Sequence, residues 1–184
     1  MSTDFSGYWK MISNDNFEEY LKALDVNIAL RKIAVLLKPD KDIVQKGDHV
    51  VIKTISSLRN YLMEFDIGKE FPEDLSGIDD RQCKTTVNWD GDKLVCVQRG
   101  EKQGRGWTHW IEGDELHLDL YLVDLLGPGH SPSIFPENTS EERAANVIID
   151  VSQLSTPTSA SAETHTSELR VGEITSKQVF KKVQ

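Results

Sequence analysis

One histidine stands between a tryptophan and an isoleucine in a stretch that alternates like a β-strand, Arg105 to Asp114. Every second side chain of a strand lies on the same face, so Trp107, His109 and Ile111 point the same way. An imidazole is an unusual lining for a purely apolar core, but it suits the polar end of a mostly apolar cavity. This pattern predicts a small β-barrel that encloses one apolar ligand, with His109 beside the ligand's polar group.

The composition excludes several classes of function. The chain has 184 residues and a net charge of −9, and it has no basic stripe that would neutralise nucleic-acid phosphates. No apolar run approaches the roughly 20 residues of a spanning helix, and the first residues lack the features of a signal peptide. Cys83 and Cys96 have neither metal-binding nor disulfide-framework spacing. We therefore expect a reduced, cytoplasmic protein that does not bind nucleic acid.

Hydrophobic periodicity predicts two short helices among many short strands. Apolar residues recur at helical spacing from Phe17 to Leu24, and Asn27 caps a second helix that Pro39 ends. Elsewhere the period is two. The predicted strands are 5–11, 42–45, 49–55, 58–65, 69–71, 84–89, 93–99, 105–111, 116–123 and 173–183. Short antiparallel strands with a helix pair near the start indicate an all-β closed meander or a sandwich.

Several stretches resemble the intracellular lipid-binding proteins. Gly7-x-Trp9-x-Met11, followed by Asn16-Phe17-Glu18-x-Tyr20-Leu21, is similar to the N-terminal signature of that family. Within the family, residues 1–120 and 174–184 resemble the cellular retinol-binding proteins, particularly the type I members. The similar stretches include 4–11, 17–20, 23–27, 31–34, 36–41, 59–61, 106–107 and 177–184. The resemblance implies a ten-stranded antiparallel β-clam, a lipocalin-like closed barrel capped by a helix-turn-helix.

The resemblance also implies where the ligand's head group lies. Fatty-acid carriers of the family hold a carboxylate with two arginines, and the matching positions here are His109 and Gln178. A buried carboxylate needs fixed cations, whereas a neutral imidazole and an amide suit an alcohol. The family identifies that alcohol as all-trans-retinol, with retinaldehyde as an alternative. Type I members have glutamine where His109 stands, and other retinol-binding members have histidine.

The role of His109 leads to a pH expectation. A neutral imidazole that accepts the hydroxyl proton should lose the ligand as the pH falls below its free pKa of roughly 6.5. The alternative role is a core histidine that bonds to a backbone carbonyl.

The resemblance assigns further residues to the ligand. Lys41 is placed near the hydroxyl end, Met63 lies along the polyene, and Trp107 belongs to the same site. Without the family, Lys41 is a surface residue and Met63 a core residue. Arg59 shares a predicted strand face with Met63, so it either points inward or forms a salt bridge at the strand end.

Other residues are expected at the cavity wall or at its entrance. Phe17 and Leu58, with Ile28 and Ala34, line the cavity or portal, and ordinary packing accounts for them equally well. On the helix pair, the family implies that Lys22, Arg31 and Lys32 contact a membrane retinol receptor or the bilayer. The alternative for these charges is a solvated helix face.

Residues 121–172 interrupt the family pattern. Gly- and Pro-rich residues 126–136 and a low-complexity run at 155–167 predict an inserted, mostly disordered loop between a barrel body, 1–120, and a final strand, 173–184. Closing about fifty residues instead of about four costs roughly 2 kcal/mol. We therefore expect residues 121–123 to continue the ninth strand and the last strand to dock. The alternative is a barrel that opens beside His109.

No catalytic set is recognisable, because the histidines are scattered and no Ser or Cys lies in a nucleophile motif. We expect no cofactor, no metal and no enzyme activity. The leading hypothesis is a monomeric cytosolic carrier for vitamin A, which shields retinol and delivers it to retinoid-metabolising enzymes. The alternatives are a carrier of another neutral lipid or a fatty acid, and a chain in which the insert spoils the pocket.

Overall fold

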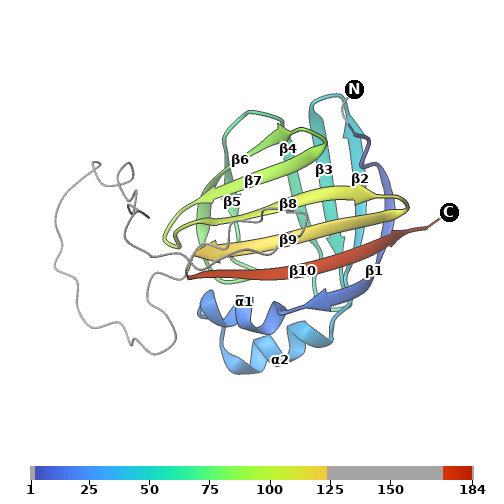
Figure 1. The fold of residues 1–184 in the computed structure, drawn as a ribbon. Helices are drawn as coiled ribbons and strands as arrows, with labels where there is room; N and C mark the ends of the chain where they lie inside the picture. Colours follow the sequence, from blue (N-terminus) through green and yellow to red (C-terminus); the bar gives the residue numbers. More distant parts are fainter. Residues whose placement is uncertain (1–2, 124–171, 184) are drawn as a thin grey trace, which may run out of the picture. The chain divides into compact units, whose positions relative to one another are not determined.

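Buried and exposed side chains alternate along most strands, which gives the sheet one buried face. The computed structural model describes residues 3–123 and 172–183 (Figure 1). Ten strands form one sheet in the order β4-β3-β2-β1-β10-β9-β8-β7-β6-β5, and each pairs with its neighbours antiparallel. The elements are β1 (Gly7–Asp15), α1 (Phe17–Ala23), α2 (Ile28–Leu36), β2 (Asp40–Lys46), β3 (His49–Ile55), β4 (Tyr61–Asp66), β5 (Phe71–Asp74), β6 (Gln82–Asp90), β7 (Lys93–Arg99), β8 (Arg105–Glu112), β9 (Glu115–Val123) and β10 (Glu173–Lys182).

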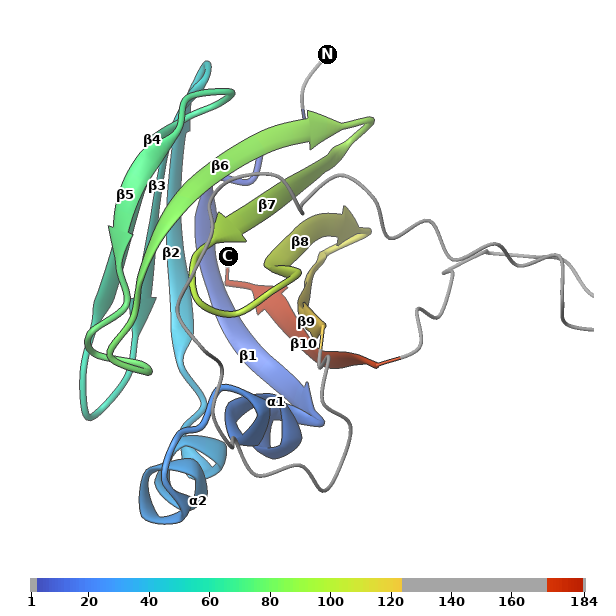
Figure 2. The ribbon, with the colours of Figure 1, turned by 90° about the vertical axis from the view of Figure 1, so that its left-hand side faces the viewer.

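The two ends of the sheet, β4 and β5, are joined by side chains. Phe65 of β4 stacks on Phe71 of β5, with ring centroids 5.9 Å apart and ring planes 7° apart. Figure 2 shows the sheet curling until these strands lie beside each other. The result is a nearly closed barrel whose core includes Trp9, Val50 and Phe180, each at most 1% exposed. The predicted all-β barrel is confirmed.

β1 is longer than predicted. The local pattern predicts that this strand ends at Met11, whereas the structure continues it to Asp15, with a bulge between Met11 and Ser13. Asn14 lies opposite Gln178 of β10. The prediction was wrong because backbone pairing with a distant strand, and not local periodicity, holds this segment extended.

The two helices lie at one end of the barrel and differ in how they are held (Figures 1 and 2). Tyr20 and Leu21 of α1 are buried in a cluster that includes Leu122 of β9. No residue of α2 is buried. The predicted cap of α2 is confirmed, because the Asn27 side chain accepts a hydrogen bond from the backbone N–H of Leu30 at 3.0 Å. The barrel therefore anchors α1 more firmly than α2.

The last strand docks between β9 and β1, as expected for an intact barrel. β10 pairs with β9 at nine positions and also pairs with β1. The end of β9 packs closely on β8 and the turn before it, since the Val123 side chain covers Gly104 and Tyr121 covers Gly106. The prediction that residues 121–123 continue the ninth strand is confirmed. The predicted insert, 121–172, overlaps β9 at its first three residues, and the prediction of disorder for 124–171 lies outside the described residues.

A candidate ligand site inside the barrel

Strand register brings His109 and Gln178 into one row. His109 of β8 pairs with Leu118 of β9, and Leu118 pairs with Gln178 of β10. Residues directly opposite each other in an antiparallel pair share a face of the sheet, and all three side chains are buried. We call these three residues the head-group row. Two polar side chains that are far apart in the chain therefore lie two strands apart on the inner face.

His109 has unused hydrogen-bonding capacity. The residue is 3% exposed, and its ring meets Trp107 edge to face, with centroids 4.6 Å apart. Neither ring nitrogen has a hydrogen-bond partner in the described part of the chain. The alternative of an imidazole bonded to a backbone carbonyl is therefore not observed.

The environment of His109 keeps its ring uncharged. Burial, and secondly the ammonium of Lys41, hold the pKa of His109 well below 6.5. A neutral imidazole presents one donor and one acceptor. The expectation that ligand is lost as the pH drops below about 6.5 used the free pKa, and burial moves that loss to a lower pH.

Lys41 is a buried residue of β2. It is 7% exposed, its Nζ donates to Thr54 Oγ1 at 3.3 Å, and it lies 5.5 Å from the centre of the Phe180 ring. Phe180 is the next inward residue after Gln178 on β10, so the amine lies beside the head-group row. Burial lowers the pKa of Lys41 to about 8. The family-based placement of Lys41 near the head group remains a prediction, and the geometry is consistent with it.

Gln178 is oriented by a residue that sequence reasoning did not assign to the site. Its Nε2 donates to Oδ1 of Asn14 at 3.1 Å, and the residue is 6% exposed. Asn14 lies beyond the predicted end of the first strand, so the sequence gives it no role in the site. Its role depends on the extended β1 and on the β1–β10 register, which carry no local sequence signal.

The remaining predicted ligand residues divide into buried and exposed sets. Trp107 and Met63 are each 6% exposed within the main core. Phe17 is half-buried on α1 and stacks on Tyr20. Leu58 is 66% exposed and Arg59 is also exposed.

The predicted strand 58–65 begins too early. β4 starts at Tyr61, and Leu58 and Arg59 lie in the bend before it. Arg59 therefore does not share a strand face with Met63. The guanidinium of Arg59 instead lies against Gly77.

The three cations predicted at the portal are tied to neighbouring groups of the helix pair. The contacts are Lys22 to Glu19 at 3.5 Å, Lys32 to Glu18 at 2.7 Å, and Arg31 Nη1 to the Val26 carbonyl at 2.8 Å. Such contacts fit both a solvated helix face and a surface that meets a partner.

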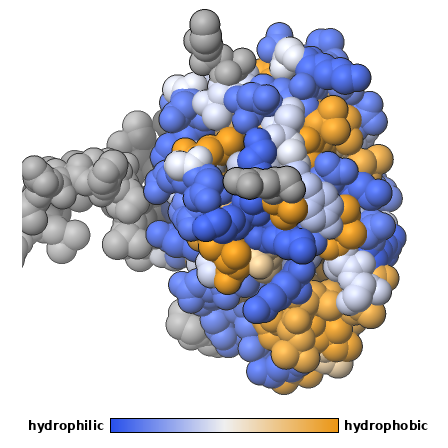
Figure 3. Space-filling view, turned by 90° about the vertical axis from the view of Figure 1, so that its right-hand side faces the viewer, coloured by the Kyte–Doolittle hydropathy of each residue, from blue (hydrophilic) through white to orange (hydrophobic). Residues whose placement is uncertain are grey.

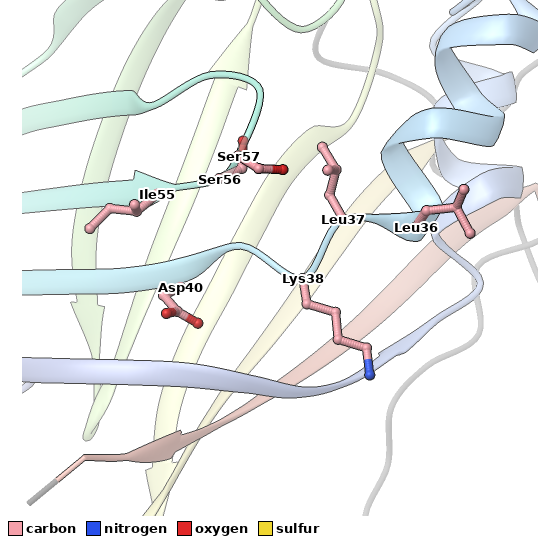
Figure 4. Close-up of a pocket in the computed structure, with 7 residues that line it drawn as sticks. All are labelled: Leu36, Leu37, Lys38, Asp40, Ile55, Ser56 and Ser57. Atoms are coloured by element: carbon pink, nitrogen blue, oxygen red, sulfur yellow. The ribbon is translucent and has the colours of Figure 1, made fainter.

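Apolar surface gathers at the helical end of the barrel (Figure 3). On α2, four apolar residues are exposed: Ile28 at 63%, Leu30 at 53%, Ile33 at 44% and Leu36 at 81%. A pocket of about 440 Å³ lies between the end of α2 and the turn after β3 (Figure 4). Its lining residues are Leu36, Leu37, Lys38, Asp40, Ile55, Ser56 and Ser57.

A second group of polar side chains inside the barrel, around Glu73, carries no clear signal in the sequence. Glu73 of β5 is 5% exposed and accepts hydrogen bonds from the Gln98 amide and, at 3.5 Å, from the Thr85 hydroxyl. The half-buried Tyr61 lies near this carboxyl and helps to lower its pKa. We call Glu73, Thr85, Gln98 and Tyr61 the Glu73 cluster. Alternation is a weak signal in a four-residue strand that contains proline, so the sequence alone did not place Glu73 inside.

Thiol and metal chemistry have little support in the described part of the chain. Cys83 and Cys96 are both buried and free. Burial raises the pKa of both thiols, which makes them poor nucleophiles. Within residues 3–123 and 172–183 no group of His, Cys, Asp or Glu is arranged to hold a metal ion. Neither helix of this part has the length and apolarity to span a membrane.

A nearly closed ten-stranded barrel with a two-helix cap and buried polar side chains on its inner face defines a class of lipid-binding proteins. Residues 6–124 match the model described as the lipocalin / cytosolic fatty-acid binding protein family, and the chain belongs to this family.

Known relatives make the resemblance more specific. The chain is 73% identical to Retinol-binding protein 1 of Homo sapiens over 126 residues, which are 68% of this chain and 93% of the relative. It is 58% identical to Retinoid-binding protein 7 of Mus musculus over 121 residues, 66% of this chain and 90% of the relative. The solved structure of human cRBP IV superposes with a TM-score of 0.70 at 40% identity, covering 98% of this chain and 99% of that one. The resemblance to cellular retinol-binding proteins is confirmed.

Proposed function

We propose that this protein is a cytosolic carrier that binds all-trans-retinol inside the barrel. The hydroxyl group lies at the head-group row, and the isoprenoid chain lies among the apolar inward residues. The 73% identity to a protein named for retinol binding supports this ligand class. Retinaldehyde, which shares the hydrocarbon chain but has no hydroxyl donor, is expected to bind more weakly.

The observation that carries the proposal is the buried, neutral imidazole of His109, whose ring nitrogens have no hydrogen-bond partner among the described residues. A hydroxyl group donates one hydrogen bond and accepts another, as does a neutral imidazole. An ionised carboxylate would find no permanent cation at His109, and its desolvation would oppose binding. The head-group row therefore favours an alcohol.

A second candidate, a fatty-acid carrier, is favoured by one observation. The amine of Lys41 is buried beside the row and pairs with no carboxylate in the described part of the chain. With a pKa of about 8 it is largely protonated at neutral pH, so it offers one cation to an acid. One partly titrated amine compensates a carboxylate less well than two arginines, so we rank this candidate second.

Parallel titrations with retinol and oleate test the proposal. Wild-type protein should bind retinol, seen as quenching of tryptophan fluorescence and a rise in retinol fluorescence, and should bind oleate weakly. The Lys41→Met variant should lose any oleate binding and weaken retinol binding much less, because the alcohol does not depend on a cation. Tight oleate binding that disappears in this variant would favour the fatty-acid carrier. Failure of both ligands would indicate a barrel whose binding the insert impairs.

The proposed function also includes delivery of retinol to retinoid-metabolising enzymes. Exposed apolar residues of α2 and nearby Lys22, Arg31 and Lys32 support a contact surface at the helical end for these enzymes or a membrane retinol receptor. Because contact is transient, the carrier is expected to be monomeric. Transfer of retinol to acceptor membranes should slow when Leu36 is replaced by Ser, with Leu62→Ser on the barrel wall as a matched exposed control.

A further inference from the structure

The Glu73 cluster has an unmet hydrogen-bonding capacity inside the barrel. Gln98 and Thr85 both donate to Oε1 of Glu73. The other oxygen, Oε2, is buried and has no partner among the described residues. Buried carboxyl oxygens are normally hydrogen-bonded, because water that they lose on burial must be replaced. The cluster therefore presents a fixed polar atom that a ligand can satisfy.

Strand geometry separates this cluster from the head-group row by a substantial distance. Gln98 pairs with Arg105, and Leu94 pairs with His109. The two levels are thus four residues apart along β7 and β8, or about 13 Å at about 3.3 Å per residue. This spacing is comparable to the length of a retinoid between its terminal oxygen and its ring.

The inner wall between the two levels suits a hydrocarbon chain. Cys96 and Trp107 lie opposite each other there, and Val87 pairs with Cys96. All three side chains are at most 6% exposed. At the level of the cluster, Arg105 lies near Tyr20 of α1, so the cluster lies toward the helical end.

We propose that the Glu73 cluster is a second polar subsite, which binds an oxygen on the ring of the ligand, so that the barrel accepts retinoids with a second hydroxyl on the ring. The inference rests on the proposed function, since it places the first oxygen at the head-group row. A ring hydroxyl donates to Oε2 of a carboxylate, or accepts from Oε2–H of a carboxylic acid. It therefore fits Glu73 in either protonation state.

The charge state of Glu73 restricts the class of ligand. Burial raises the pKa of Glu73, although Gln98, Tyr61 and Arg105 act in the opposite direction. A second carboxylate on the ligand would meet this acidic group and lose affinity by repulsion or desolvation. A hydroxyl has no such cost, so the subsite selects an uncharged oxygen.

The test compares all-trans-retinol with its 4-hydroxy derivative on the full chain. Wild-type protein should bind the hydroxylated ligand at least as tightly as retinol. Glu73→Leu should weaken the hydroxylated ligand about tenfold relative to retinol, the usual effect of one buried hydrogen bond to an ionisable group. Gln178→Met is the matched control, because it removes a polar group from the other end and should weaken both ligands alike.

The readout is the ratio of the affinities of the two ligands, measured on one variant. A general folding defect lowers both affinities and leaves this ratio unchanged. Glu73→Met, which is also apolar but closer to glutamate in length, should change the ratio in the same direction, and it keeps the test decisive if Glu73→Leu does not fold, as judged by circular dichroism. A ratio that both folded variants leave unchanged, with retinol binding intact, would overturn the subsite and leave the proposed function standing. If only the hydroxylated ligand binds and depends on Glu73, the subsite stands and the retinol proposal fails. Binding of neither ligand overturns both.

Discussion

Replacing Lys41 by methionine should make the protein more stable at neutral pH. Burial lowers the pKa of Lys41 from 10.5 to about 8, and each unit corresponds to about 1.36 kcal/mol. Holding the charged amine inside therefore costs about 3 kcal/mol. Methionine keeps the length of the apolar stem, but it loses the hydrogen bond to Thr54, worth about 1 kcal/mol. The net gain should be about 2 to 3 kcal/mol.

The gain should depend on pH in a defined window. Below pH 8 Lys41 is protonated in both the folded and the unfolded chain, so the full cost is present. As the pH rises from about 8 to 10.5, the folded chain releases its proton first, and wild-type stability rises toward that of the variant. Above this window both states are neutral, and the advantage of methionine disappears.

Urea unfolding followed by tryptophan fluorescence measures this difference. Unfolding free energies of wild type and Lys41→Met are compared at pH 7 and at pH 10.5, without ligand. The exposed residue Lys53 of β3 supplies a matched control, because Lys53→Met should change stability little and equally at both values. A Lys41→Met variant that is less stable at pH 7, or a difference that is constant with pH, would refute the reasoning.

Other substitutions test the head-group row and a buried ion pair. His109→Leu should weaken retinol binding about tenfold in fluorescence titrations. An unchanged affinity would show that His109 does not hydrogen-bond to the retinol hydroxyl. Wild-type unfolding free energy in urea should fall below about pH 6.5, because there the unfolded His109 gains a proton first; an equal fall in His109→Gln would contradict this. The carboxylate of Asp79 lies 2.8 Å from Nη1 of Arg105 and forms a buried ion pair with it. Asp79→Asn leaves the guanidinium without its counter-charge, so the unfolding free energy measured in urea should fall by about 3 kcal/mol. A loss below about 1 kcal/mol would refute it.

Sequence periodicity is sufficient to predict those features of the fold that depend on residues close together in the chain. Alternation correctly placed Trp107 and His109 on the inner face, because their strand is long and flanked by a clear turn. The same holds for the Asn27 cap, a local interaction that spans three residues. These features depend on neighbours in the chain, so the sequence contains the information directly.

Polar residues inside the barrel could not be found in this way. Lys41 stands between two aspartates just after a proline, a pattern typical of surface. It is buried because β2 is flanked by β1 and β3, where Trp9 and Thr54 lie opposite it. Glu73 is inside because a four-residue strand pairs with β6. Burial of such groups is decided by long-range register, and only the family resemblance drew attention to Lys41.

The same register explains how a site can include residues from both sides of a long insert. Closing about fifty extra residues costs roughly 2 kcal/mol. Docking β10 buries Phe180 and Ser176 completely and Gln178 almost completely, and burial of one phenylalanine alone contributes about 1.5–3 kcal/mol. Pairing with two neighbouring strands adds to this gain. Because Gln178 is part of the docked strand, the same contacts that close the barrel also place Gln178 in the head-group row.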